Sequence, residues 1–376
     1  MATSPGHVSG IGNAPRRARG RRLNVALLAP PWFAVPPRRY GGTERVVSLL
    51  AEKLVQAGHE VTLYASGDSS SSAELRSTYA ASLPGRLGEE AASFRHALTC
   101  FREARRFDLI HDHTGPAALA LSTMVPVPVL HTVHGSLAGE AGEIYRGLDE
   151  LGARAGLVSL TLAQRAPAPL LNWVGTCANG IDPEEYPIKA ANGGAYLAFL
   201  GRMGPEKGCR QAIAIARMSG WDLRIAAKCT EPAERRYFHR YVEPCLDGRV
   251  RYVGEVDHRG KVELLQGAAA LLFPVAWEEP FGLAMIEAMA CGTPVAATRR
   301  GSTGELVIPG RNGLLVDDWS SMADVLPEID ALDRRQIRQT VIDRYTADRM
   351  ADGYLRLYRD ELERRSIGRR SRSGVA

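Results

Sequence analysis

Two glutamates with seven residues between them accompany a predicted helix start, in the segment Glu279-Pro-Phe-Gly-Leu-Ala-Met-Ile-Glu287. The helix is expected to begin near Gly282, with the backbone N–H groups of Phe281, Gly282 and Leu283 pointing out of its start. Such N–H groups, together with the helix dipole, favour an anion such as a diphosphate. Glu279 can accept hydrogen bonds from sugar hydroxyls, and Glu287 can hold a ribose diol. The alternative is a solvated loop acid followed by an acid on the helix surface.

A second segment places two cations directly after a predicted strand. It has the sequence Gly201-Arg-Met-Gly-Pro-Glu-Lys-Gly208 and follows the apolar run 196–200. Glycines let the backbone approach a ligand closely. Arg202 and Lys207 lie where the charge of a leaving diphosphate would need stabilisation. A surface loop with two solvated cations is the alternative.

Histidines follow two predicted strands in the first half of the chain. His134 stands near the end of His131-Thr-Val-His-Gly135 and can hydrogen-bond a sugar hydroxyl or stabilise charge at a reacting carbon. A purely structural histidine is the alternative. The run His111-Asp-His113 ends the neighbouring strand and invites a metal site. Because no further cluster of ligands and no acidic pair accompanies it, we expect no metal.

A glycine pair follows the first predicted strand and its proline-rich loop. In Tyr40-Gly-Gly-Thr-Glu44, Gly41 and Gly42 let the chain approach a substrate closely. No G-x-G-x-x-G pattern follows the strand, so this is not a dinucleotide fingerprint. Asp68 also lacks the preceding sequence that would place it on a ribose. Both observations disfavour a nicotinamide or flavin enzyme.

Short apolar runs alternate with helical patterns in both halves of the chain. Such runs are typical of buried parallel strands, and the alternation predicts an α/β fold with two doubly wound sheets. Because ligands bind beyond the carboxyl ends of such strands, two domains facing across a cleft would bring the segments above together. A polar linker is predicted at 183–195. The predicted strands are 24–29, 60–65, 108–110, 127–133, 157–160 and 173–178, then 196–200, 223–227, 250–253, 269–273 and 294–297.

The net charge of +5 comes from the two ends of the chain. Residues 1–22 and 364–376 together hold ten arginines and no acid, which leaves −5 for the residues between them. A nucleic-acid-binding domain carries a basic face on its folded part, so we expect no nucleic-acid partner. The ends are expected to be disordered tails, and weak attraction to an anionic membrane is the alternative.

The remaining composition indicates a cytoplasmic protein. Six scattered cysteines form no C-x-x-C pair, which favours reduced, buried thiols over zinc ligands or disulfides. No apolar run approaches the roughly 18 residues of a membrane span, and the N-terminus lacks the apolar core of a signal peptide. Residues 94–106 either contact a membrane peripherally as a basic amphipathic helix or pack on the core with a solvated face. Their apolar and basic members are Phe94, Arg95, Leu98, Phe101, Arg102, Arg105 and Arg106.

Together these motifs resemble the retaining family-4 glycosyltransferases over about residues 24–365. The motifs that carry the resemblance are Gly41–Glu44, His134-Gly135, Asn179–Asp182, Gly201–Gly208 and Glu279–Val295. The family has the type-B fold, in which two Rossmann-like domains face each other across a deep cleft. The resemblance implies an acceptor-side domain at 23–185, a donor domain at 186–346 and a helix at 347–365 that crosses back to the first domain. The basic composition of the ends adds disordered tails at 1–22 and 366–376.

The resemblance also implies roles for single residues. Arg202 and Lys207 would bind the donor diphosphate, Glu279 the hydroxyls of the transferred sugar, and Glu287 the ribose. His134 would lie near the anomeric carbon. The further donor-binding residues would be Gly41, Gly42, Phe281, Gly282 and Leu283, with Gly254 and Val256 near the base. Relatives often have glycine where this chain has Ala227, which implies a differently shaped base pocket.

The expected function is therefore transfer of a sugar from a nucleotide-diphosphate donor, with retention, without a metal and without a cofactor. The implied path is front-face, so the acceptor attacks on the side that the diphosphate leaves. Uridine diphosphate is the expected donor nucleotide, and guanosine-diphosphate mannose is the alternative. The acceptor and the oligomeric state are left open. The alternative functions are a nucleotide-sugar epimerase or phosphorylase on the same fold, and a non-catalytic nucleotide-sugar binding module.

Overall fold

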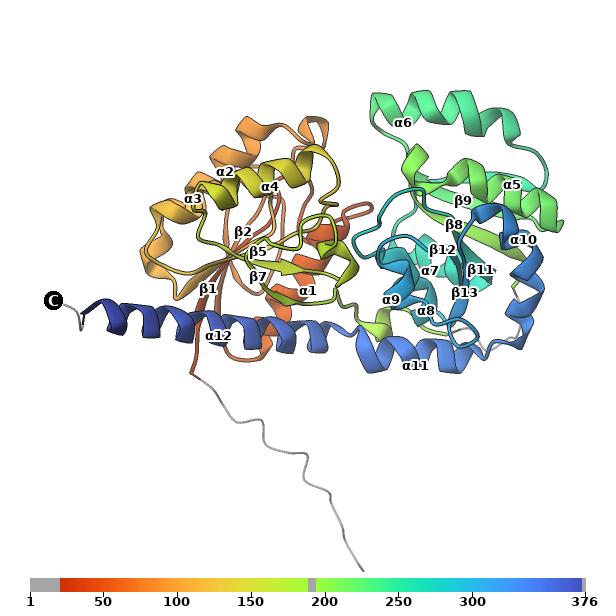
Figure 1. The fold of residues 1–376 in the computed structure, drawn as a ribbon. Helices are drawn as coiled ribbons and strands as arrows, with labels where there is room; N and C mark the ends of the chain where they lie inside the picture. The colour runs from red at the N-terminus through yellow and green to blue at the C-terminus, as the bar shows by residue number, and fades with distance from the viewer. Residues whose placement is uncertain (1–20, 189–193, 374–376) are drawn as a thin grey trace, which may run out of the picture.

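The computed structural model describes residues 21–188 and 194–373. They form two lobes, each built on one sheet flanked by helices (Figure 1). Every strand pair in both sheets is parallel. The prediction of two doubly wound α/β domains is thus confirmed.

The N-terminal sheet has the strand order β3-β2-β1-β4-β5-β6-β7. Its strands are β1 (Asn24–Leu28), β2 (Glu60–Tyr64), β3 (Glu74–Arg76), β4 (Leu109–Asp112), β5 (Val129–Thr132), β6 (Gly156–Ser159) and β7 (Trp173–Thr176). Its helices are α1 (Gly42–Gln56), α2 (Glu90–Arg102), α3 (Pro116–Leu121) and α4 (Glu140–Glu150). The central strands are buried on both faces, as their continuous apolar sequences predict.

The C-terminal sheet has the order β10-β9-β8-β11-β12-β13. Its strands are β8 (Tyr196–Arg202), β9 (Leu223–Lys228), β10 (Val250–Gly254), β11 (Ala268–Phe273), β12 (Val295–Thr298) and β13 (Gly313–Val316). Its helices are α5 (Cys209–Ser219), α6 (Pro232–Tyr237), α7 (His258–Gly267), α8 (Leu283–Ala290), α9 (Thr303–Leu306), α10 (Met322–Val325) and α11 (Arg334–Arg344).

Each sheet reverses its strand order at one point, between β1 and β4 in the first and between β8 and β11 in the second. The loops that leave the carboxyl ends of such neighbouring strands diverge and open a crevice. The Gly41-Gly42 pair follows β1, the Gly201–Gly208 segment follows β8, and Glu279 follows β11. The topology therefore gathers the predicted site segments at the two crevices.

The last helix, α12 (Ala347–Ser373), runs under the N-terminal domain (Figure 1). It packs against α1 and β7, and Tyr354 and Tyr358 are fully buried in the core of that domain. The helix was expected at 347–365 with a disordered tail from 366. It instead continues to Ser373, and only residues 374–376 of that tail lie outside the described residues.

Other sequence predictions need correction or lie outside the described residues. The strands β3 and β13 were not predicted; β3 is only three residues long, and two of the three are charged. Of the predicted linker, 189–193 is not described, whereas Tyr186 is fully buried in the C-terminal core. Cys229 and Cys245 are only half-buried. Residues 1–20 of the predicted N-terminal tail are not described.

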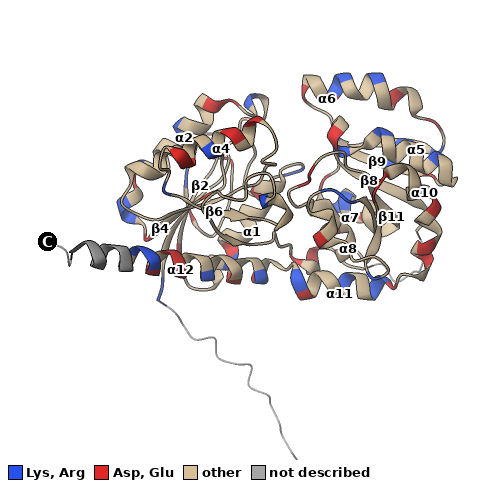
Figure 2. Cartoon of the chain, in the orientation of Figure 1, with Lys and Arg blue, Asp and Glu red and all other residues tan. Residues whose placement is uncertain are grey.

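In Figure 2, neither domain shows a helix face of one charge sign that stands out among the described residues. Acidic and basic residues are interleaved along the helices of both domains (Figure 2). Phe101 is buried, Arg95 lies over the Tyr79 ring at 5.4 Å, and Arg106 pairs with Glu103. These contacts favour the core-packing interpretation of residues 94–106. Within the described chain, no helix has the length and apolar character needed to cross a membrane.

Candidate functional site

Two adjoining cavities lie between the domains. The first, here called the inner cavity, has a volume of about 210 Å³ and is lined by Gly41, Val256 and Glu287 among others. The second, here called the aromatic cavity, has a volume of about 380 Å³ and takes its name from five large rings. These rings are Trp32, Phe33, Tyr40, Trp277 and Phe281. The residues that line both cavities are Tyr40, Gly42, Arg202, Lys207, Glu279, Gly282 and Leu283.

Lys207 and Glu279 form an ion pair where the two cavities meet. Lys207 Nζ lies 2.6 Å from Glu279 Oε2, and Trp277 Nε1 donates to the same oxygen at 2.9 Å. Lys207 is also 4.6 Å from the centroid of the Trp277 ring. The lysine keeps donors in reserve, because one ammonium carries three. Glu279 Oε1 accepts no hydrogen bond within the described residues, so it remains available to a ligand.

Glu287, like Glu279, has one carboxylate oxygen that is bonded by the protein and one that is not. The Tyr186 hydroxyl donates to Glu287 Oε1 at 2.8 Å, and Lys261 forms an ion pair with the same atom. The carboxyl group is buried, and its Oε2 has no partner among the residues that the structure describes. Two donors on one oxygen hold the group in place while the other oxygen stays free. The sequence analysis did not identify Tyr186 or Lys261 as partners of Glu287. Tyr186 lies in the predicted linker, and Lys261 lies in α7, outside every motif.

The start of α8 lies between these two glutamates, as predicted. Gly282 caps the helix with φ 81°, a left-handed conformation that favours glycine. A Cβ at this position would lie 2.6 Å from Met285 Cε and 3.1 Å from Phe273 Cζ, so Met285 would have to shift to admit a side chain. The backbone N–H groups of Phe281 and Gly282 donate no hydrogen bond within the described chain. They remain available for an anion at the positive end of the helix dipole.

Arg202 is the last residue of β8 and, with Lys207, one of the two cations that line both cavities. Its guanidinium lies 2.6 Å from Glu206 and 3.9 Å from Glu234. The side chain is 35% exposed, so these pairs leave part of the group open to the cavities. Arg202 can therefore support Lys207 electrostatically, but its charge is partly neutralised.

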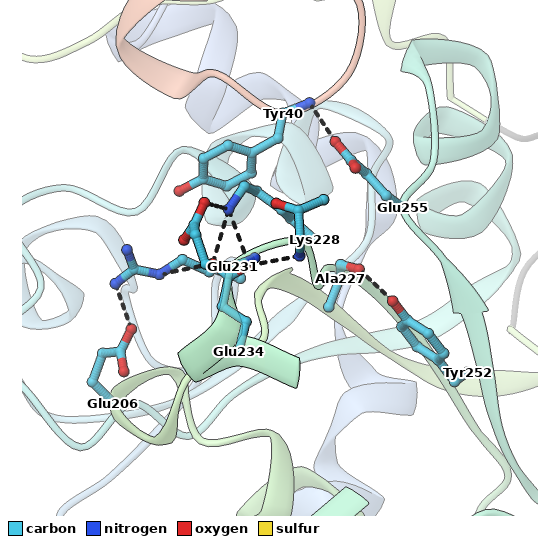
Figure 3. A network of polar contacts seen from close by, with 10 residues as sticks. Tyr40, Glu206, Ala227, Lys228, Glu231, Glu234, Tyr252 and Glu255 are labelled. Atoms are coloured by element: carbon cyan, nitrogen blue, oxygen red, sulfur yellow. Dashed lines mark hydrogen bonds and ion pairs between the residues drawn. The ribbon is translucent and has the colours of Figure 1, made fainter. Parts of the chain in front are cut away.

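A loop of the N-terminal domain closes over the inner cavity. The Tyr40 N–H donates to Glu255 Oε1 at 3.1 Å, across the domain boundary (Figure 3). The Tyr40 ring lies 5.3 Å from Lys228 Nζ, and burial raises the pKa of its hydroxyl to about 12. Lys228 is buried and pairs with Glu231 and Glu234. These contacts, none of them predicted, hold the Gly41-Gly42 turn against the C-terminal domain.

His134 lines the aromatic cavity and not the inner one. Its Nε2 lies 2.8 Å from His113 Nδ1. Burial and the neighbouring His131 lower the pKa of His134 to about 3, and burial also holds the pKa of His113 well below its usual range. Both rings are therefore neutral at ordinary pH. His134 can exchange hydrogen bonds with a ligand but does not bring a positive charge.

The neighbouring residues of the suspected metal motif are committed to the protein's own hydrogen bonds. His111 bonds the Tyr358 hydroxyl at 2.7 Å and the Thr132 hydroxyl at 2.8 Å, and Asp112 binds His131 and Thr114. In the described part of the chain, no three His, Cys, Asp or Glu side chains are grouped as metal ligands. The motif connects β4 to β5 and α12.

The structure thus brings together most of the residues singled out in the sequence. Gly254 is the exception, because it lines neither cavity, although its neighbour Glu255 does. Phe281 and His134 belong to the aromatic cavity only. The missed residues share one cause: Tyr186, Lys228 and Lys261 belong to no motif and meet the site only through folding.

Comparison with known proteins agrees with this architecture. Residues 40–181 match the family model described as Glycosyltransferase Family 4, and residues 194–329 match the model described as Glycosyl transferases group 1. Glycogen synthase of Mycobacterium tuberculosis is 30% identical over 240 residues, which are 56% of each chain. The chain thus matches little more than half the length of this curated relative.

Two crystal structures extend the likeness to almost the whole fold. A glycosyltransferase involved in avilamycin A biosynthesis is 25% identical with a TM-score of 0.65, covering 91% of this chain and 98% of that one. The Anabaena protein HepE, in complex with UDP and glucose, is 18% identical with a TM-score of 0.70, covering 89% and 99%. The chain therefore has the two Rossmann-like domains of the type-B glycosyltransferase fold, with residues 40–181 similar to the family-4 model and residues 194–329 similar to the group-1 model.

Proposed function

We propose that the protein is a retaining glycosyltransferase that moves a sugar from a nucleotide-diphosphate donor to a hydroxyl of an acceptor. One observation carries the proposal. A single cavity combines a cation, a helix start with unbonded N–H groups, and two glutamates that each have one unbonded carboxylate oxygen. These are Lys207, the α8 start at Gly282, Glu279 and Glu287. A cation and free N–H groups suit a diphosphate, and fixed carboxylate oxygens suit hydroxyl groups.

The free oxygens define how the donor would lie. Glu287 Oε2 accepts from the ribose hydroxyls, and the Phe281 and Gly282 N–H groups with Lys207 bind the diphosphate. Glu279 Oε1 accepts from a hydroxyl of the sugar, beside the aromatic cavity. This order places the bond to be broken where the two cavities meet. The acceptor then enters through the aromatic cavity.

The chemistry follows from that placement. The acceptor hydroxyl attacks the anomeric carbon on the face that the diphosphate leaves, and the departing phosphate oxygen takes the hydroxyl proton. Lys207, Arg202 and the helix start stabilise the charge that grows on the diphosphate, so the reaction needs no metal and no cofactor. Removing one such donor typically lowers turnover by a factor of about 100–1,000. Neutral His134 accepts or donates a hydrogen bond beside the reacting carbon.

Uridine diphosphate is the proposed donor nucleotide. The support is the Anabaena relative, which was crystallised with UDP and glucose and shares the fold over 89% of this chain. Ala227 lines the inner cavity at the expected base end, and its methyl group narrows the space there relative to a glycine. The sugar of the donor is not specified by any contact in the cavity.

The test is release of nucleoside diphosphate from a panel of nucleotide sugars, with and without a mixture of sugars, inositol and phenyl glycosides as acceptors. Lys207→Ala should lower acceptor-dependent release at least 100-fold. Lys53→Ala is the matched control, because the Lys53 side chain is as exposed as that of Lys207 (21% against 19%) and forms an ion pair, with Asp348, outside both cavities.

The outcomes separate the competing functions. Acceptor-dependent release, with a glycoside product whose anomeric configuration matches the donor by NMR, supports the proposal. Release that never depends on an acceptor indicates an epimerase or a hydrolase instead. Binding of a nucleotide sugar without release from any donor indicates a binding module.

A further inference from the structure

The aromatic cavity has walls that differ from those of the inner cavity. Its N-terminal-domain side presents the rings of Trp32 and Phe33, and Trp277 and Phe281 face it from the C-terminal domain. Cavities with aromatic walls and a few polar groups bind ligands that have an apolar face and hydroxyl groups. If the proposed function holds, this cavity adjoins the sugar of the donor and receives the acceptor.

No cationic side chain reaches the aromatic cavity from the N-terminal domain, within the described residues. The two cations that do line it, Arg202 and Lys207, come from the other domain and already pair with Glu206 and Glu279. A phosphate or carboxylate on the acceptor would have no cation of its own there. Burying an unpaired charge is strongly unfavourable, so the wall selects against an anionic acceptor.

Glu44 is the acid on that wall, and its carboxyl group bonds no residue other than its own backbone N–H. It lies in the first turn of α1, two residues after Gly42, with its side chain 3% exposed. No hydrogen bond or ion pair joins its carboxyl group to another residue of the described chain. Burial raises the pKa of Glu44 to about 8, so the group is protonated at neutral pH. A protonated carboxyl group offers one donor and one acceptor.

We propose that the aromatic cavity binds an uncharged acceptor with a hydroxylated ring, and that Glu44 binds a hydroxyl group of that ring. The ring packs against Trp32 and Trp277, while Glu44 donates one hydrogen bond and accepts another. Glu44 acts as a specificity residue: it orients the acceptor and transfers no proton in the reaction. This inference rests on the proposed function, since the acceptor cavity is defined by the position of the donor.

The test uses the full chain saturated with the nucleoside diphosphate that binds it best, and ligand-observed NMR to measure weak binding. The probes are phenyl glucoside and inositol, each compared with its own phosphate monoester. We expect each neutral probe to bind at least tenfold more tightly than its phosphate. Tighter binding of the phosphates, or no binding of either neutral probe to the nucleotide-loaded protein, would overturn the inference.

Two variants separate recognition from a structural role of Glu44. Glu44→Leu should weaken binding of the neutral probes at least tenfold, because it removes both hydrogen bonds. Glu44→Gln should stay within about threefold of the natural protein, because its amide also donates and accepts. Both should bind nucleotide normally, because Glu44 does not line the inner cavity. Unchanged probe binding by Glu44→Leu contradicts the role of Glu44, whereas a natural protein that binds no nucleotide refutes the proposed function and this inference with it.

Discussion

What a side chain in the cleft can bind depends on which of its atoms already bond other residues of the protein. Glu279 and Glu287 each have one oxygen held by two donors and one oxygen free. The sequence could identify these glutamates, because they stand in a motif with a helix start. It could not show which oxygen is free, because the donors Trp277, Tyr186 and Lys261 take their places only when the chain folds.

Glu44 provides a prediction at the same scale. Its pKa is about 8 in the folded protein and near 4.5 in the unfolded chain. Between these values the folded state keeps a proton that the unfolded state has lost, so the free energy of unfolding falls as pH rises. The slope is up to about 1.4 kcal/mol per pH unit. Glu44→Gln cannot titrate and should therefore gain stability relative to the natural protein between about pH 5 and 8.

Denaturant unfolding at several pH values measures this difference. Glu52→Gln is the control, because hydrogen bonds from Ser71 and Ser72 keep the pKa of Glu52 below its usual value despite partial burial. That pair of proteins should keep a constant difference over the same range. A constant difference for Glu44→Gln as well would show that Glu44 is already ionised in the folded protein.

At the scale of elements, the sequence predicted the strands and helix ends that nearby residues determine. Apolar runs identified the central strands, and Gly282 marked the start of α8. The sequence did not predict β13 or β3, of which β3 has only three residues with a charged one at each end. It also ended the last helix at residue 365, whereas α12 continues to Ser373. The strand order then explains why the predicted motifs converge, since they follow the strands on either side of the two switch points.

The start of α8 gives the prediction at this scale. Gly282→Ala should lower stability by about 1–3 kcal/mol, because alanine is strained at positive φ, and it should also weaken nucleotide binding. The added Cβ would push against Met285 and Phe273 and displace the N–H groups at the helix start. Chemical denaturation and nucleotide titration measure the two effects.

Gly310 supplies the matched comparison for that variant. It has a similar φ of 74°, and a Cβ there would meet nothing within 4 Å. Gly310→Ala should therefore show the conformational cost alone and bind nucleotide normally. If Gly282→Ala also bound nucleotide normally, the helix start would not be part of the site.

The whole molecule is held together by contacts that cross the cleft. The Tyr40 N–H donates to Glu255, and the Arg45 guanidinium lies 3.3 Å from His258 Nδ1. The helix α12 follows the C-terminal domain in sequence but buries Tyr354 and Tyr358 in the N-terminal core. The domains are therefore connected both beside the inner cavity and along the base of the molecule, and a ligand in that cavity contacts both of them.

Because the inner cavity is formed by both domains, a nucleotide that fills it should stabilise the fold as a whole. The decisive measurement is thermal unfolding with a panel of nucleoside diphosphates and nucleotide sugars. At about 100 times its Kd, the correct nucleotide should raise Tm by roughly 3 °C. Lys207→Ala should abolish the rise and Lys53→Ala should keep it. If no nucleotide raises the Tm of the natural protein, or if Lys207→Ala retains the full rise, the assignment of the inner cavity as the donor site is wrong.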